Sequence, residues 1–268
     1  YLPLNPLFVT TTNNKQQKMT DNTAGAFIFT IQDNVQREFF NGLEISGVTI
    51  VATLLLELVS LETAKASYAK DKMLYLQGVA YNFVNHFLYA IPVYITAAVS
   101  FVRPYDDAYN YWLAAFQVFA VLLIHSICYY EVHKTFHSSP GYYQYHKFHH
   151  RFNTHVTPFA ANAVGFVEYV FAYVLPFAVA FAVVRPYPTS NYISIYIVSF
   201  TNLIIHTPSI ETWSERNLPA WLVTTHDHLE HHRKLNIHYS APTMNLDWAL
   251  DKVVSSGSVL LFGMKQTN

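Results

Sequence analysis

Long runs of apolar residues recur along the middle of the chain, separated by short polar stretches. Four of these runs approach the roughly 20 residues that a helix needs to cross a bilayer, at about 79–102, 110–132, 164–184 and 190–207. Pro92 and Pro176 fall inside the first and third runs, where packed membrane helices tolerate proline with a kink. The fourth run contains more polar residues than is usual for a membrane-spanning helix, so these polar side chains need hydrogen-bond partners inside a helical bundle. The pattern predicts an all-α integral membrane protein with about four transmembrane helices.

Two short turns with the same Arg-Pro-Tyr opening pair these runs into two helical hairpins. Arg103-Pro104-Tyr105-Asp106-Asp107 joins the first pair, and Arg185-Pro186-Tyr187-Pro188 joins the second. This pairing puts the N-terminal arm, residues 133–163 and residues 208–268 on one side of the membrane. That side would hold every Lys and Arg except Arg103 and Arg185, so the positive-inside rule predicts that it faces the cytosol, or the matrix in a mitochondrion.

The N-terminal part of the chain has a different character. Residues 1–42 are predicted to form a polar arm, extended or partly ordered, and residues 43–78 an amphipathic helical segment. Glu44, Glu57 and Glu62 argue against a full membrane span there, so we expect this segment to lie at the membrane interface or to pack against the rest. Residues 79–252 would then form the membrane domain and residues 253–268 a C-terminal tail.

Composition agrees with a membrane protein and excludes several other classes. Hydrophobic residues make up 52% of the chain and charged residues only 12%, which is too little charge for a soluble surface of this size. The net charge of −1 gives no sign of a nucleic acid partner. Cys128 is the single cysteine, which excludes an internal disulfide and a cysteine zinc site.

Eight histidines gather in three short boxes. The pattern His146-Lys147-Phe148-His149-His150 recurs as His228-Leu229-Glu230-His231-His232, and His133-Lys134-Thr135-Phe136-His137 precedes both. Two copies of one such pattern are rare by chance in a chain with 14 histidines. Neutral imidazole is the commonest metal ligand, and eight imidazoles can hold a pair of metal ions. The boxes therefore predict a metal centre.

Helical spacing suggests how the boxes present their ligands. His133 and His137 are four residues apart, so they share a face on a helix that continues from the second apolar run. In each H-x-x-H-H box we expect the first and second histidines to share a face and the third to be turned by about 100°. A box of this form can offer ligands to two metals.

The three boxes together resemble those of the fatty acid hydroxylase and sterol desaturase superfamily, whose members are integral membrane, non-haem di-iron oxygenases. The segment Asn202-Leu203-Ile204-Ile205-His206 lies between the second and third boxes, as in that superfamily. The tail from Asn236 to Thr243, followed by Asp247, is similar to the stretch that follows the family's last box. The resemblance covers roughly residues 79–252.

This resemblance implies the chemistry and the ligands. It implies two iron ions, with zinc as a substitute in a purified sample, and no catalytic or cofactor-binding residues beyond the metal centre. The substrate would be a membrane lipid or sterol, hydroxylated or desaturated with dioxygen, and a separate electron donor such as a cytochrome b5-like protein would supply electrons. The expected membrane is that of the endoplasmic reticulum, with the mitochondrial inner membrane as the alternative. The expected ligands are His133, His137, His146, His149, His150, His228, His231 and His232, with His206 as an extra one.

Two departures from the family pattern leave other functions open. Gly165-Phe166 stands where the family often has His-Pro before the position of Glu168, and His238 stands where Asn is common. One alternative is a structural or accessory subunit of a larger membrane complex, derived from such an enzyme. A weaker alternative is a zinc hydrolase, although eight imidazoles exceed the three protein ligands of a hydrolytic zinc site.

Other polar residues near the boxes have weaker claims on the metal. His226 is expected to be a surface residue of the loop before the third box. His155 and His238 are expected to contact the metal ligands or the substrate rather than the metal. Asp227 and Glu230 could orient imidazoles, but solvated helix positions explain them better. His86 stands alone in the first apolar run, where a hydrogen-bonded structural role is expected.

Overall fold

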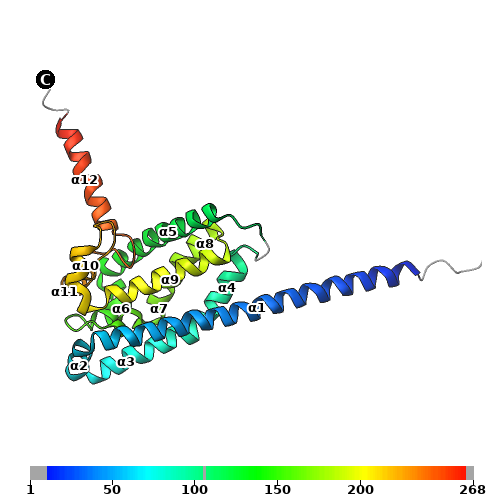
Figure 1. The fold of residues 1–268 in the computed structure, drawn as a ribbon, viewed down its shortest axis with the longest axis horizontal. Coiled ribbons are helices and arrows are strands. Elements are labelled where there is room, and N and C mark those ends of the chain that lie inside the picture. The colour runs from blue at the N-terminus through cyan, green and yellow to red at the C-terminus, as the bar shows by residue number, and fades with distance from the viewer. Residues whose placement is uncertain (1–10, 105–106, 264–268) are drawn as a thin grey trace, which may run out of the picture.

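The computed structural model describes the backbone of residues 11–104 and 107–263 and the side chains of residues 33–104 and 107–255. Helices dominate the described chain, whose β structure is limited to one antiparallel bridge between Leu222 and Met244. The helices form a bundle from which both ends of the chain project (Figure 1). The predicted all-α membrane fold is confirmed.

The helices of the bundle follow one another along the chain with short connections. The first half contains α1 (Thr11–Val59), α2 (Leu61–Lys70), α3 (Lys72–Phe83), η1 (Val84–Ala90), α4 (Ile91–Phe101), α5 (Tyr111–Ser138) and α6 (Pro140–His150). The second half contains η2 (Pro158–Asn162), α7 (Phe166–Glu168), η3 (Tyr169–Val174), α8 (Leu175–Val184), α9 (Pro188–Ile205), η4 (Pro208–Ile210), α10 (Glu211–Asn217), α11 (Thr225–Lys234) and α12 (Leu246–Gly263).

Four helices are long and apolar enough to cross a membrane, namely Asp33–Val59, Lys72–Phe101, Tyr111–Ser138 and Phe166–Val184. The last three confirm the first three predicted spans. The fourth predicted span, residues 190–207, corresponds to α9, which meets the same test only together with the next helical segment, Pro208–Asn217, bent away from it by 84°. The predicted number of spans is right, but one member differs: the chain is a multi-pass membrane protein whose set of spanning helices includes α1.

Residues 1–10 of the predicted extended or partly ordered arm lie outside the described residues, and the rest is helical, because α1 runs without a break from Thr11 to Val59. The polar residues between Thr10 and Thr23 suggested a loop, yet the sequence has no proline between Pro6 and Pro92 to end a helix. The predicted boundary at residue 42 therefore falls inside one helix. Its second half packs along α4 and α9, which supports packing against the bundle over placement at the membrane interface.

A buried acidic residue in α1 explains why the charges of this segment misled the prediction. Glu57 accepts a hydrogen bond from the Tyr75 hydroxyl at 2.7 Å and another from the backbone N–H of Phe159 at 3.3 Å. A charged group can lie inside a membrane bundle when such partners replace water. Glu57 thus fastens α1 to α3 and to η2 instead of holding the segment at the surface.

Each proline of the spans follows a π-helical stretch. Pro92 lies in the first turn of α4 after η1, and Pro176 lies in the first turn of α8 after η3. Proline lacks an N–H and its ring crowds the preceding turn, and the wider π turn accommodates both defects. Such π turns are frequent at functional sites.

The tips of the two predicted hairpins contact each other at one end of the bundle. The backbone N–H of Arg103 donates to the Pro186 carbonyl at 2.9 Å, and the Arg103 Nε donates to the Arg185 carbonyl at 2.9 Å. Gln117 joins the same end by accepting from the Tyr187 N–H at 2.9 Å. These bonds fix α4, α5, α8 and α9 relative to one another.

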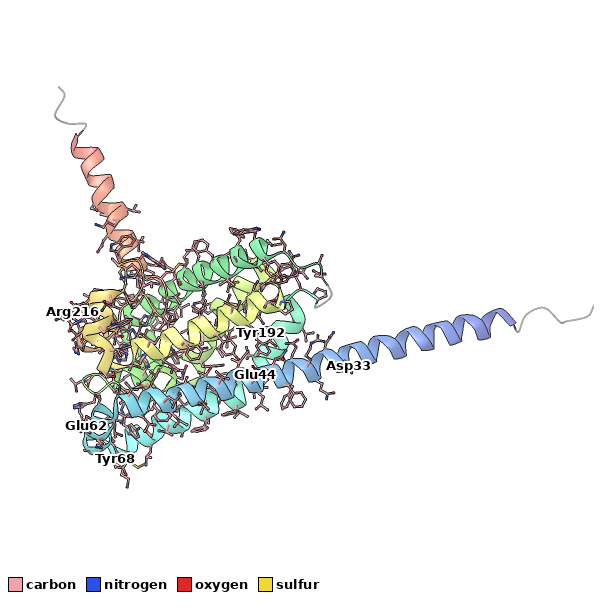
Figure 2. The ribbon with its side chains drawn as sticks, viewed as in Figure 1. Asp33, Glu44, Glu62, Tyr68, Tyr192 and Arg216 are labelled. Atoms are coloured by element: carbon pink, nitrogen blue, oxygen red, sulfur yellow. The ribbon has the colours of Figure 1, made fainter. Side chains whose placement is uncertain are left out.

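The start of α1 lies at the tip end, opposite to the end where the histidine boxes gather. Figure 2 places Asp33 and Tyr192 toward the tips, and Glu62, Tyr68 and Arg216 at the opposite end. The prediction that the N-terminal arm shares a side with the boxes is therefore wrong, because α1 itself runs from the tip end to the box end. The helices at the box end, α2, α6, α10 and α11, carry Lys65, Lys70, Lys147, Arg216, Arg233 and Lys234, against Arg103 and Arg185 at the tips, so the positive-inside rule keeps its direction.

Cysteine labelling in sealed vesicles tests the crossing by α1. In a Cys128→Ser background, Asp33→Cys and Glu62→Cys are expected to react with a membrane-impermeant maleimide from opposite sides, because both residues are exposed and lie at opposite ends of the span. Both variants should react fully after detergent is added. Labelling of both residues from the same side would show that α1 lies at the membrane interface and does not cross the bilayer.

Candidate metal centre

Four helices bring the histidine boxes to one end of the bundle. The last turns of α5 carry the first box, α6 carries the second, the residue after α9 is His206, and α11 carries the third. Local sequence explains the short helices: Ser139 caps α6 with Pro140 in its first turn, and Thr224 caps α11 in a capping box with Asp227. The predicted continuation of the second span into the first box is confirmed.

All nine histidines predicted as ligands lie in this cluster, where they form two groups. Within each group, one nitrogen of every ring lies within 4.8 Å of one nitrogen of every other ring, a geometry that could hold a metal ion. Group A contains His133, His137, His146, His150 and His231. Group B contains His149, His206, His228 and His232. The rings of the two groups adjoin, with His150 and His232 centred 4.7 Å apart.

Each H-x-x-H-H box serves both groups, as predicted, but with a different division of its histidines. His146 and His150 enter group A while His149 enters group B; in the third box, His228 and His232 enter group B while His231 enters group A. The first and second histidines do lie side by side, with ring centres 5.2 Å apart for His146 and His149, but they enter different groups. Residues four apart on a helix differ by about 40° and residues three apart by about 60°, so the first and third histidines are better aligned.

The ring nitrogens within each group approach as closely as ligands around one ion. In group A the Nε2 atom of His146 lies 3.0 Å from that of His133 and 2.8 Å from that of His150. In group B the Nε2 atom of His228 lies 2.9 Å from that of His206 and 3.2 Å from that of His232. A zinc or iron ion bound to imidazole nitrogens at about 2.0–2.1 Å brings its ligands to comparable separations.

Hydrogen bonds on the far side of several rings test whether a cation fits. The Nδ1 atom of His133 lies 2.8 Å from the Tyr239 carbonyl oxygen, and that of His146 lies 2.6 Å from Oε1 of Glu168. These acceptors place the ring proton on Nδ1 and leave a lone pair on Nε2. The two Nε2 atoms at 3.0 Å then face each other with no proton to share, and a metal ion between them removes the repulsion.

Two further rings show the same arrangement. His206 Nδ1 donates to the Asn202 carbonyl at 2.7 Å, and His231 Nδ1 donates to the Ile237 carbonyl at 2.7 Å. The Nε2 atom of His231 is buried among the described residues without a hydrogen-bond partner. Each group therefore presents bare nitrogen lone pairs to its centre, and the residues fit a metal site.

Electrostatics keep the imidazoles of α6 and α11 neutral. Burial lowers the pKa of His231 to about 4. Burial, reinforced by neighbouring imidazoles, also holds the pKa of His146, His150 and His228 well below the ordinary value. Only neutral imidazole has a lone pair for a metal, so these rings are in the ligand form near pH 7.

The residues with weaker claims on the metal have other partners. His226 lies 3.2 Å from Glu211, and Glu230 pairs with Arg233 at 2.9 Å. Asp227 belongs to the cap of α11. No described contact joins Asp227 or Glu230 to an imidazole of group A or group B. His155 lies beside Thr154 outside the two groups.

His86 and His238 also lie outside the two groups. The Nδ1 atom of His86 lies 2.9 Å from the Asn82 carbonyl, which agrees with a structural role. His238 has a φ of 54°, in the left-handed region where Asn and His are enriched. Histidine therefore tolerates this backbone conformation, as the Asn that is common at this position in the family does.

Sequence reasoning missed the groups that orient the imidazoles. Glu168, 2% exposed, accepts from His146, and the carbonyls of Ile237 and Tyr239 accept from His231 and His133. The loop that carries these carbonyls is held by Asp247, which accepts from the Ser240 backbone and hydroxyl. A carboxylate inside an apolar span is a functional candidate by default, so Glu168 could have been found; backbone carbonyls leave no trace in a sequence.

Comparison with known proteins gives one match. The model of the fatty acid hydroxylase family matches residues 118–252, which is half of the chain. The matched region runs from α5 into α12 and includes all nine histidines of the two groups, although it begins well after the predicted start of the domain at residue 79. No curated protein and no solved structure matches the chain. On the boxes, the fold and this match, the chain belongs to the fatty acid hydroxylase family.

Proposed function

We propose that this chain is a membrane-bound di-iron oxygenase that uses dioxygen to hydroxylate or desaturate a C–H bond of a lipid or sterol. The observation that carries the proposal is the pair of adjoining imidazole groups at the end of a membrane bundle. Two adjoining ions can share the binding and reduction of one dioxygen molecule, which one isolated ion does less readily. The family match supports the same class of reaction.

The number of nitrogens favours iron over zinc. Group A offers five imidazoles, whereas zinc sites are almost always tetrahedral, with four protein ligands when structural and three when catalytic. Imidazole suits iron, and five imidazoles would suit iron better than tetrahedral zinc. The proposed ligands are the nine histidines of groups A and B. When bound, the two irons would supply the oxidant that removes hydrogen from the substrate.

The protein's own residues prepare the site for that chemistry. The carbonyls of Tyr239, Ile237 and Asn202 and the Glu168 carboxylate accept the distal ring protons, so the lone pairs point inward before metal arrives. Burial on the bundle side excludes bulk water from the imidazoles. Apolar spans below the centre offer a lipid a path to it without leaving the membrane.

The reaction needs electrons that the chain does not supply, so we extend the proposal to a separate electron donor such as a cytochrome b5-like protein. Hydroxylation of RH by O₂ consumes two electrons and two protons and yields ROH and water. A pocket of about 380 Å³ on the box end is lined by His150 together with Lys70, Lys147 and Arg151. Asp71 also lines this pocket and pairs with Arg151 at 3.4 Å, so Lys70 and Lys147 leave a positive balance beside a group A histidine that suits an acidic donor.

We place this activity in the endoplasmic reticulum membrane, with the mitochondrial inner membrane as the alternative. The greater number of positive residues at the box end supports an orientation with the metal centre toward the cytosol, or the matrix. An electron donor on that side would then reach the pocket beside His150.

Elemental analysis of protein purified gently in detergent tests the proposal. About two irons per chain are expected, one for each group, together with a lipid product that forms only when dioxygen and reductant are both present. Zinc that can be exchanged for iron, with gain of activity, would agree with substitution during purification. A folded chain that binds no metal would contradict the oxygenase and favour a structural subunit of a membrane complex.

A further inference from the structure

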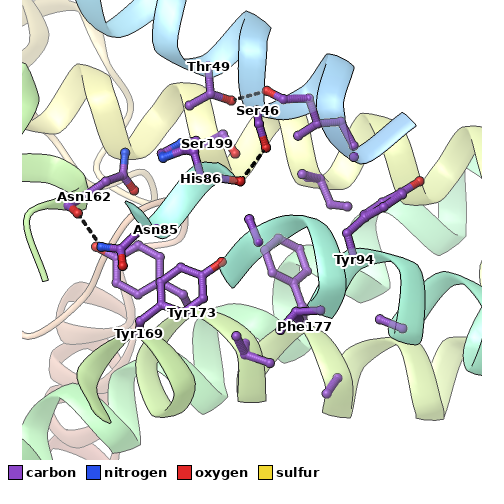
Figure 3. A pocket seen from close by; sticks show the side chains of 18 of the residues that line it. Ser46, Thr49, Asn85, His86, Tyr94, Asn162, Tyr169, Tyr173, Phe177 and Ser199 are labelled. Carbon is purple, nitrogen blue, oxygen red and sulfur yellow. Dashed lines mark hydrogen bonds between the residues drawn. The ribbon is translucent and has the colours of Figure 1, made fainter. Parts of the chain in front are cut away.

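A cavity of about 150 Å³ lies inside the bundle among α1, η1, α4, η3, α8 and α9 (Figure 3). Most of its wall is apolar, with Val93, Ala97, Phe177, Phe181 and Ile195 among its residues. The polar side chains Asn85, His86, Asn162, Tyr169 and Tyr173 also line it. The cavity is thus an apolar space with a polar part.

The polar part lies close to group B. The Asn162 Oδ1 accepts from Asn202 Nδ2 at 3.5 Å, and the Asn202 carbonyl accepts from His206 Nδ1 at 2.7 Å. On the other wall, the Tyr173 hydroxyl donates to the Ala161 carbonyl at 2.6 Å, which also accepts from Asn202 at 3.1 Å. Two hydrogen bonds therefore connect the cavity wall to a histidine of the candidate metal centre.

The two π-helical stretches carry four of the polar residues of the cavity. Asn85 and His86 belong to η1, and Tyr169 and Tyr173 belong to η3. A π turn shifts the register of the side chains that follow, and π turns are frequent at functional sites. Both departures from regular α-helix thus line the same space.

The side-chain oxygen of Asn85 is a hydrogen-bond acceptor that has no donor in the described structure. Its side chain is buried, and its Nδ2 donates to the carbonyls of Asn162 at 2.8 Å and Val164 at 3.0 Å. These two bonds fix the amide, because the flipped orientation would set Oδ1 against two carbonyl oxygens. Oδ1 is left with no hydrogen-bond partner in the described structure, and such a buried acceptor requires a donor from elsewhere.

His86 adds a second acceptor. Its Nδ1 lies against the Asn82 carbonyl at 2.9 Å and must be the donor there, so a neutral ring keeps its lone pair on Nε2. No Lys, Arg, Asp or Glu is among the described residues that line the cavity. The space therefore suits a neutral group that donates a hydrogen bond, and it disfavours a carboxylate, which only accepts.

We propose that this cavity binds the hydroxyl end of a neutral lipid alcohol, with the hydroxyl donating to Oδ1 of Asn85. This assignment rests on the proposed function, because it names the class of lipid that the neighbouring centre oxidises. The cavity is smaller than the roughly 300–1,000 Å³ pockets that bury a whole ligand, so it holds the hydroxyl and the adjacent carbons while the rest of the lipid extends beyond it.

Ligand chemistry gives a test that does not depend on a variant folding. The full chain in detergent is equilibrated with radiolabelled 1-hexadecanol, and unlabelled 1-hexadecanol, 1-methoxyhexadecane and palmitate compete for it. The alcohol is expected to compete at least about tenfold better than the ether or the acid, because both competitors leave Oδ1 of Asn85 unpaired. Equal competition by the ether would overturn the proposal.

Variants then locate the binding site. Ala97→Phe fills the cavity from α4 and is expected to lower alcohol binding at least about tenfold, whereas Val99→Phe, on the exposed face of the same helix, should not. Asn85→Leu should remove the preference for alcohol over ether. Unchanged binding in Ala97→Phe would contradict the assignment.

Binding and oxidation can fail independently. The binding measurement needs neither metal nor dioxygen, so alcohol binding in a folded chain that takes up no metal would refute the oxygenase and support the cavity assignment. Oxidised product from a chain that binds ether and alcohol equally well would support the oxygenase and refute the cavity assignment.

Discussion

Replacing His228 with alanine is expected to remove one of two metal ions and to abolish turnover. His228 is buried in group B, where its Nε2 atom approaches those of both His206 and His232. Group B has four imidazoles, so loss of one leaves three and opens a cavity in place of the ring. We expect metal content to fall from about two ions to about one, and activity to fall by more than the roughly 10–100-fold that loss of an outer partner costs.

A matching substitution in the other group makes the experiment sharper. The double change His133→Ala and His137→Ala leaves three imidazoles in group A, so it should remove the group A ion and leave the ion of group B, and each variant should keep about one ion. His155→Ala removes a histidine outside both groups and should keep both ions. Metal content is measured per chain after gel filtration, which also reports folding. Two ions retained in either group variant would refute the ligand assignment.

Spacing along the chain was enough to predict which histidines come together but not their division between two groups. All nine histidines come together because each box lies within one helical turn or two, and the helices end on the same side of the bundle. Which ring enters which group depends on whether a neighbour three or four residues away is better aligned. The difference between these alignments is only about 20°, so packing of α6 and α11 against their neighbours decides it.

The same limit explains the error in α1. Glu44 and Glu57 made the segment look interfacial, but the partners of Glu57 come from residues far along the chain, Tyr75 and Phe159. A sequence shows that a side chain is charged, but it does not show which distant group will form a hydrogen bond with it. Polar residues inside an apolar segment therefore predict that partners exist, without predicting where they lie.

Glu168 is expected to control metal affinity in group A although it contacts no ion. Its Oε1 accepts from His146 Nδ1 at 2.6 Å, and both side chains are 2% exposed. This bond holds the ring orientation and keeps the lone pair of Nε2 directed at the other imidazoles of group A. Glu168→Leu removes the acceptor, so the apparent affinity for the group A ion should fall by about 10–100-fold.

The conservative change Glu168→Gln separates orientation from general damage. Its amide oxygen can still accept from His146 Nδ1, so metal affinity should stay within a few-fold of the parent, about 1 kcal/mol or less. Phe171→Leu, an exposed position in the following π-helical stretch, is the matched control for shortening a side chain in this span. Affinity is measured by competition with a chelator, and the group B ion serves as an internal reference. Equal affinities in the Leu and parent proteins would show that His146 holds its position without Glu168, and equal losses in Gln and Leu would show that the carboxylate charge, rather than the accepted hydrogen bond, is what the site requires.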